Sequence, residues 1–79
     1  MNLEWDRAKA AADRLKHRVS FADAIGVFYD PTALTVADNH RGEERFATVG
    51  FDSFGRLLVV VYCWRGNAIR IISAQGDAP

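Results

Sequence analysis

Two stretches near the start of the chain repeat apolar residues with helical spacing. A first helix is predicted to begin after Asp6, which can cap its N-terminus, and to end near Lys16. Its apolar face is expected to consist of Ala8, Ala11, Ala12 and Leu15. A second helix is predicted to follow the cap residue Ser20 and to end before Asp30, because Pro31 disfavours helical conformation in the residue before it. Its apolar face is expected to consist of Phe21, Ala24, Ile25 and Phe28.

The rest of the chain predicts a small sheet. Residues 31–43 are mostly polar, which indicates an irregular connection with at most a short edge strand near residues 34–36. Three β runs follow, at residues 45–51, 56–64 and 68–74. Short glycine-containing turns separate them, which is typical of consecutive hairpins. We therefore predict one α+β domain over residues 1–79, with two N-terminal helices packed on an antiparallel sheet of three to four strands.

The middle β run is apolar on both faces. One face carries Leu57, Val59, Val61 and Cys63, and the other carries Leu58, Val60, Tyr62 and Trp64. The two helices can cover one face, whereas the residues after Ala74 are too few and too broken for a third helix. We expect another chain to cover the second face, and we assign Leu58, Val60 and Trp64 to the partner-binding surface.

Composition and charge narrow the class of protein. The 79 residues include 10 basic and 10 acidic side chains and are 49% hydrophobic, so the chain can form a core but has no net charge that would attract nucleic acid or a membrane. The single cysteine and the lack of a signal-peptide pattern favour the cytoplasm. The longest apolar run, residues 57–64, is far shorter than the roughly 20 residues that span a bilayer, so no membrane partner is expected.

Few residues suggest chemistry by themselves. His17, His40, Asp38 and Cys63 show no metal-ligand spacing, and neither a metal nor another cofactor is expected. Lys16 and His17 end the first predicted helix, where they either complement the helix dipole or hold a phosphate and transfer a proton.

Arginines and aromatic residues of the predicted sheet have two interpretations each. Arg45, Arg56 and Arg70 belong to three neighbouring strands, where they are either solvated partners of carboxylates or parts of an anion site. Tyr62 and Trp64 are either stacking platforms for bases or packing residues. Cys63 lies in an apolar strand and is interpreted as an inert core residue.

An ordered set of short motifs over residues 3–74 resembles the BrnT toxin family. The set comprises Leu3-Glu4-Trp5-Asp6, Lys9, Lys16-His17, Phe21, Glu44-Arg45, Gly50, Gly55-Arg56, Val59, Tyr62 and Ile69-Arg70-Ile71-Ile72-Ser73-Ala74. The resemblance implies a RelE-like fold and a ribonuclease toxin that blocks translation. It also implies a cognate antitoxin of the BrnA kind, with a ribbon-helix-helix part, in a toxin homodimer or a heterotetramer.

The resemblance also implies metal-free RNA cleavage and assigns roles to matching positions. Arg45 and Arg70 would stabilise the charge of the phosphorane, His17 or Glu44 would act as base, and Lys16 would position the phosphate. The substrate-binding residues would be Arg56, Tyr62 and Arg65.

The sequence departs from the family pattern at its C-terminal side. Gln75 stands where an arginine usually follows Ile72-Ser73-Ala74, and the family's basic C-terminal helix has no counterpart. One alternative is therefore a toxin-derived interaction module without catalytic activity. Another is an unrelated helix-plus-sheet domain that binds a protein.

Overall fold

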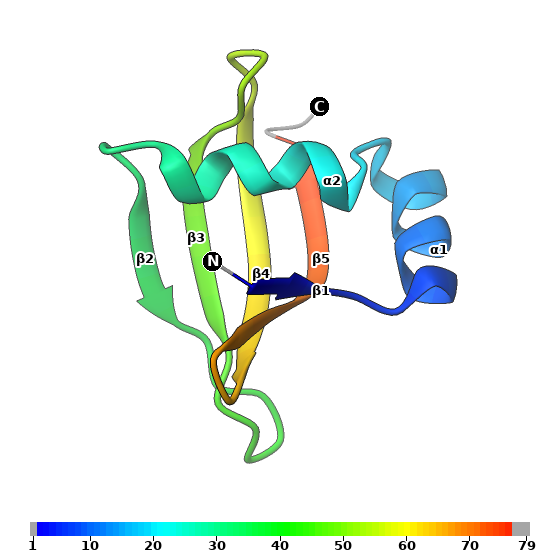
Figure 1. Cartoon of the computed structure of the whole chain (residues 1–79), viewed down its shortest axis with the longest axis vertical. Helices are drawn as coiled ribbons and strands as arrows, with labels where there is room; N and C mark the ends of the chain where they lie inside the picture. Colours follow the sequence, from blue (N-terminus) through cyan, green and yellow to red (C-terminus); the bar gives the residue numbers. More distant parts are fainter. Residues whose placement is uncertain (1, 77–79) are drawn as a thin grey trace.

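The computed structural model describes residues 2–76, which form a five-stranded sheet with helices on one face and at one edge (Figure 1). The elements in chain order are β1 (Asn2–Glu4), α1 (Arg7–His17), α2 (Phe21–Ala24), the 3-10 helix η1 (Ile25–Tyr29), β2 (Leu34–Ala37), β3 (Phe46–Phe51), β4 (Leu57–Arg65) and β5 (Ala68–Gly76).

The sheet is mixed, with the strand order β1-β5-β4-β3-β2. Strands β2 to β5 form the expected antiparallel meander, whereas β1 runs parallel to β5 and pairs with it from Asn2–Ala68 to Glu4–Arg70. The α+β class is therefore correct, but the expected count of three to four strands and the expectation that the chain starts with a helix are wrong. A three-residue strand has too few positions to show alternation.

Helix α1 begins where it was predicted, but it faces the sheet with a different side. The Asp6 carboxylate accepts the N–H groups of Ala8 and Lys9 at 2.8 and 3.2 Å, which caps the helix. The predicted apolar face is wrong, since Leu15 is 85% exposed. The residues that are half-buried against the sheet are Ala10, Asp13 and His17. The small alanines offer little apolar area, and Asp13 makes a polar contact to β5 by accepting the N–H of Ala74 at 3.1 Å.

The second helical stretch begins at its predicted cap and then tightens. The Ser20 hydroxyl accepts the N–H of Asp23 at 3.0 Å, and the α-helical turn passes into η1 at Ile25. A 3-10 helix has three residues per turn, so the buried positions fall at Phe21, Ala24 and Val27. The predicted members Ile25 and Phe28 are only half-buried.

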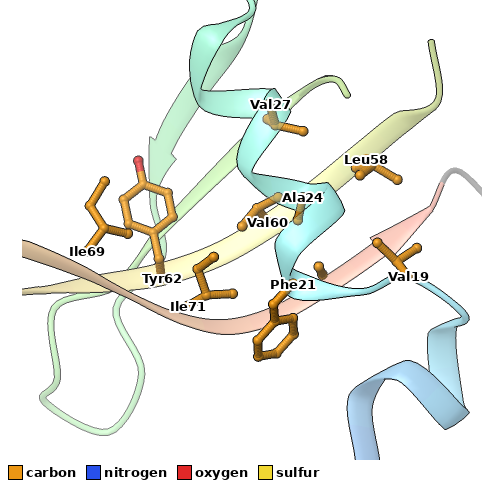
Figure 2. Packing of buried hydrophobic residues seen from close by; sticks show 10 residues of the cluster. Val19, Phe21, Ala24, Val27, Leu58, Val60, Tyr62, Ile69 and Ile71 are labelled. Atoms are coloured by element: carbon orange, nitrogen blue, oxygen red, sulfur yellow. The ribbon is translucent and has the colours of Figure 1, made fainter. Parts of the chain in front are cut away.

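The core lies between this helical stretch and one face of the sheet (Figure 2). Its buried residues are Val19, Phe21, Ala24, Val27, Leu58, Val60, Tyr62, Ile69, Ile71 and Ala74. The Tyr62 hydroxyl lies in this layer and is hydrogen-bonded to Thr48 at 2.9 Å, and Thr48 is bonded to Thr35 at 2.8 Å. The chain of hydroxyl groups satisfies the buried polar atoms of the layer.

The placement of the helices corrects the predicted partner-binding surface. Leu58 and Val60 are both 0% exposed beneath α2 and η1, so they belong to the core. Trp64, near the end of β4, is 53% exposed. Helices α2 and η1 cover the core side of the sheet; we call the opposite side, which α1 borders along β5, the open face. Its apolar residues are Leu34, Val36, Ala47, Val49, Phe51, Leu57, Val59 and Val61.

Candidate functional site

Two arginines stand on either side of Cys63 at one end of the open face. Cys63 pairs with Arg70 across β4 and β5, and Arg45 directly precedes the Phe46–Tyr62 pair of β3 and β4. Alternation along β4 turns Cys63 to the same side as Val61, away from the core layer that contains Tyr62. The register therefore brings Arg45 and Arg70 to one face.

A β-bulge in β5 makes this register compatible with the core. Val61 pairs with Ser73 and Tyr62 pairs with Ile71, which leaves Ile72 as an extra residue in β5. Because of the extra residue, Ala74 and Ile71 both face the core although they are an odd number of positions apart. The bulge thus keeps Arg70 on the open face and a continuous apolar row on the other.

Carboxylates hold both arginines. Arg45 donates from Nε to Glu43 Oε1 at 2.9 Å, and Arg70 donates from Nη1 to Glu4 Oε1 at 3.4 Å. The hydrogen bond from Arg45 and its charge, with smaller contributions from Arg65 and Lys9, hold the pKa of Glu43 below its usual value. A guanidinium has five N–H donors, so each arginine keeps donors for an anion.

Helix α1 adds two lysines beside Arg45. Lys9 and Lys16 line a shallow depression between the helix and the sheet, together with Ala12, Asp13, Arg45 and Ile72. The positive charges come from two elements, because α1 lies along β5 on the side that β1 leaves free (Figure 1). The depression is therefore a place where a phosphate group would meet cations from both sides.

An aspartate and a histidine form a pair on the inner side of α1. His17 Nε2 lies 3.9 Å from Asp13 Oδ1, and the two side chains are 23% and 11% exposed. The other oxygen of Asp13 accepts the backbone N–H of Ala74 in β5 at 3.1 Å. Asp13 thus contacts both the sheet and the imidazole of His17, next to the two lysines.

Other predicted site residues lie elsewhere. Arg56 is at the opposite end of β4, where it donates to Asp52 at 2.7 Å and to Asp23 at 3.4 Å. Tyr62 is buried in the core, with an edge-on contact to Phe28 at 5.0 Å between ring centroids. The structure therefore separates Arg56 and Tyr62 from Arg45 and Arg70.

Arg65 and Glu44, two further predicted site residues, are exposed. Arg65 is exposed at the end of β4, and its charge acts on Glu43. Glu44 is exposed next to Arg45, but the carboxylate that contacts this arginine is that of Glu43.

Lys9, Asp13 and Glu43 lie beside the candidate site although the sequence did not predict them there. Lys9, Asp13 and His17 are four residues apart, a spacing that places them on one face of a helix. This spacing is a local signal in the sequence, but the alanine pattern predicts the other side of the helix as the buried one. Glu43 gave no such signal, because it lies in an irregular connection.

The part of the chain that the structure describes contains neither a metal-binding cluster nor a membrane-spanning helix. Within residues 2–76, no group of three or more His, Cys, Asp or Glu side chains is placed to hold a metal ion. No helix in the same part of the chain has the length and apolar character needed to cross a membrane.

Comparisons with known proteins agree with the geometry of the fold. A family model described as the ribonuclease toxin BrnT of a type II toxin-antitoxin system matches residues 5–76. The crystal structure of the Brucella abortus ribonuclease toxin BrnT is similar over 100% of this chain and 99% of that chain, with a TM-score of 0.75 and 20% sequence identity. No curated protein sequence matches the chain. At this identity the structural likeness establishes the fold, and the family model matches nearly the whole sequence.

Proposed function

Because the chain belongs to the BrnT family of ribonuclease toxins of type II toxin-antitoxin systems, we propose that it cleaves RNA in the cytoplasm without a metal ion. Cleavage would stop translation until the cognate antitoxin neutralises the toxin. The observation that supports this proposal is that Arg45 and Arg70 lie on one face of the sheet, on either side of Cys63, with Arg45 beside the lysines of α1.

The proposed reaction is attack by an RNA 2′-hydroxyl group on the adjacent phosphorus. A base takes the proton of the 2′-hydroxyl, the new P–O bond forms, and the bond to the 5′-oxygen breaks as that oxygen accepts a proton. The imidazole of His17, beside the depression, is the group that would take or give the proton. Arg45, Arg70 and Lys16 would stabilise the negative charge on the phosphorane oxygens.

Cleavage of a single-stranded RNA by the purified chain tests this proposal. We expect cleavage to persist with excess EDTA, and Arg45→Ala or Arg70→Ala to lower the rate about 10²–10³-fold, as for loss of one preorganised charge-stabilising donor. Arg7→Ala is the matched control, because Arg7 is an exposed arginine of α1. A wild-type chain that cleaves no RNA, or one that EDTA inactivates, would refute the proposal.

The antitoxin is proposed to bind the open face. Four apolar side chains of β2 and β3 are exposed there, namely Leu34, Val36, Val49 and Phe51. This surface continues into the end of the sheet that carries Arg45 and Arg70, so a partner lying on it would also cover the site. An antitoxin with apolar side chains for the sheet and carboxylates for the arginines fits this surface, and a BrnA-like ribbon-helix-helix dimer would give a heterotetramer.

Binding of the antitoxin encoded beside the gene tests this surface. Val36→Asp and Val49→Asp should weaken binding at least about 100-fold, because each places a charge within an apolar interface. Leu15→Asp is the control, since Leu15 is also an exposed apolar residue but lies on α1. Equal affinity of all three variants would refute the surface, and self-association that only the two sheet variants abolish would instead identify a second copy as the occupant.

A second candidate function is supported by the carboxylates of the site. Glu43 and Glu4 each contact one of the two arginines and reduce the positive charge available to RNA. This pairing favours a toxin-derived interaction module that binds the antitoxin without cleaving RNA. Antitoxin binding by a wild-type chain that lacks cleavage activity would establish it.

A further inference from the structure

The carboxylate of Asp13 accepts a backbone N–H at the outer edge of β5. Strand β1 pairs with β5 only as far as Arg70, while β5 continues to Gly76. Beyond the end of β1, the backbone N–H of Ala74 points to α1 and donates to Asp13 Oδ2 at 3.1 Å. Ala74 is 0% exposed, so without Asp13 this N–H would be buried with no acceptor.

This hydrogen bond is a main determinant of how α1 sits on the sheet. None of the helix's own residues is fully buried, and only Ala10 packs partly against the core. Apolar contacts therefore fix the rotation of α1 weakly. A buried hydrogen bond to a charged acceptor is stronger than one between neutral groups, and it is directional.

The same carboxylate faces the proton-transfer group of the site. Asp13 Oδ1 lies 3.9 Å from His17 Nε2, one helical turn further on. Lys9 lies one turn before Asp13, and Asp13 itself lines the depression with Lys9, Lys16 and Arg45. Asp13 is thus between the sheet, the imidazole and the cations.

We propose that Asp13 is the positioning residue of the site, a statement that rests on the proposed RNA cleavage. One oxygen anchors α1 to β5 through the Ala74 N–H, which sets Lys9 and Lys16 opposite Arg45. The other oxygen faces His17 Nε2 at 3.9 Å, and in this orientation Nδ1 is left for proton exchange with the RNA. Asp13 acts through His17 and the helix and does not itself touch the phosphate.

Two substitutions of Asp13 separate the two contacts. An asparagine side chain at this position would keep an oxygen that can accept the Ala74 N–H but would lack the negative charge. We therefore expect Asp13→Asn to lower the melting temperature only slightly, because the neutral oxygen is a weaker acceptor, and to lower kcat about 10–100-fold with little change in KM. Asp13→Ala removes both contacts and should lower the melting temperature more. Asp38→Asn is the control, because Asp38 is an exposed aspartate of the loop after β2.

A double-mutant cycle with His17→Ala shows whether Asp13 acts through the imidazole. We expect Asp13→Asn to cause no further loss of kcat in the His17→Ala background. A full additional loss of kcat in that background, or wild-type kcat in Asp13→Asn, would overturn the positioning role of Asp13. Cleavage of RNA by the wild-type chain would still support the proposed function.

Nuclear magnetic resonance tests the positioning role of Asp13 even if the chain has no cleavage activity. Absence of cleavage would by itself refute the proposed function. We expect the ring-nitrogen signals of His17 to shift in Asp13→Asn, and amide exchange at Ala74 to become faster in Asp13→Ala. Unchanged ring signals together with an unchanged exchange rate would overturn the positioning role.

Discussion

The carboxylate of Asp30 accepts the backbone N–H of Phe51 at 2.8 Å, from a position 21 residues earlier in the sequence. Strand β2 begins to pair with β3 at Leu34 and Val49, so Phe51 lies beyond the last pair of the two strands. Asp30 therefore takes the place of a missing strand partner, as Asp13 does for Ala74 at the other side of the sheet. Each carboxylate satisfies a strand N–H that its neighbouring short strand does not reach.

The bonds to Asp30 make part of the stability pH-dependent. The N–H of Phe51, followed by the N–H and hydroxyl of Thr32, holds the pKa of Asp30 below its ordinary value of 3.8. A carboxyl group whose pKa is lower in the folded chain stabilises the fold fully above its unfolded pKa, and this contribution is lost as the pH falls through the folded pKa. The loss is expected from about pH 5 downward.

Asp30→Asn tests this contribution by urea unfolding at several pH values. We expect the variant to have a lower free energy of unfolding than wild type at neutral pH, and we expect the difference to shrink as the pH falls below about 4. Asp38→Asn serves as the control with the same change of charge. A difference that stays constant from neutral to acid pH would show that the Asp30 charge is not the cause.

The core beneath α2 predicts a large effect of one aromatic side chain. Phe21 is 2% exposed and packs edge-on against Trp5, with 6.1 Å between the ring centroids. Phe21→Ala should lower the free energy of unfolding by about 3–5 kcal/mol in denaturant titrations. Leu15→Ala removes a comparable apolar side chain that is already exposed and should change it by less than about 0.5 kcal/mol. Equal effects of the two variants would mean that the core is misplaced.

Local sequence signals predicted most helices and strands, but not which side of each element faces the core. Asp6 and Ser20 indicated both helix starts, since a cap is read from a few adjacent residues. The side that α1 turns toward the sheet carries Asp13, whose contact with Ala74 joins residues 61 positions apart and is therefore not indicated by any local pattern. Likewise, which face of β4 is covered depends on where α2 crosses the sheet.

The same limit applies to the candidate site. The strand order follows from the hairpins, so the sequence predicts that Arg45 and Arg70 flank the middle strand and can reach one face. Arg56 was grouped with them although it lies at the other end of β4, since sequence does not show how far along a strand two residues meet. The bulge at Ile72, which depends on packing across the sheet, also left no local signal.

A glycine in β3 is required by the approach of η1. A Cβ atom at Gly50 would lie 2.9 Å from Ala33 Cβ, 3.0 Å from Asp30 Oδ2 and 3.1 Å from Val27 Cγ1. Gly50→Ala should therefore lower the free energy of unfolding by about 1–3 kcal/mol, the usual cost of overpacking. In Gly76→Ala the nearest atom would be Leu58 Cδ2 at 3.9 Å, so this control should unfold like wild type. Equal stability of both variants would contradict the close approach.

The positive charges beside Cys63 are guanidinium groups, and lysine is expected to replace them only in part. Arg45 and Arg70 each bind a carboxylate through part of the guanidinium group, which leaves other N–H donors of the same plane for a phosphate. Lysine keeps the charge but presents a single flexible ammonium group, which cannot contact a carboxylate and two phosphate oxygens in one fixed plane. Arg45→Lys and Arg70→Lys should therefore cleave RNA at rates between those of wild type and the alanine variants.

Cleavage rates at saturating RNA separate this geometric effect from the loss of charge. We expect the lysine variants to lose about 10-fold in kcat, against the about 10²–10³-fold loss expected for alanine. Arg7→Lys should cleave like wild type, and circular dichroism must show the same fold for every variant. Wild-type kcat in both lysine variants would mean that the site needs only charge, because a point charge would then replace the planar donors without cost. Lysine variants as inactive as the alanine variants would instead show that the planar donors carry the whole effect.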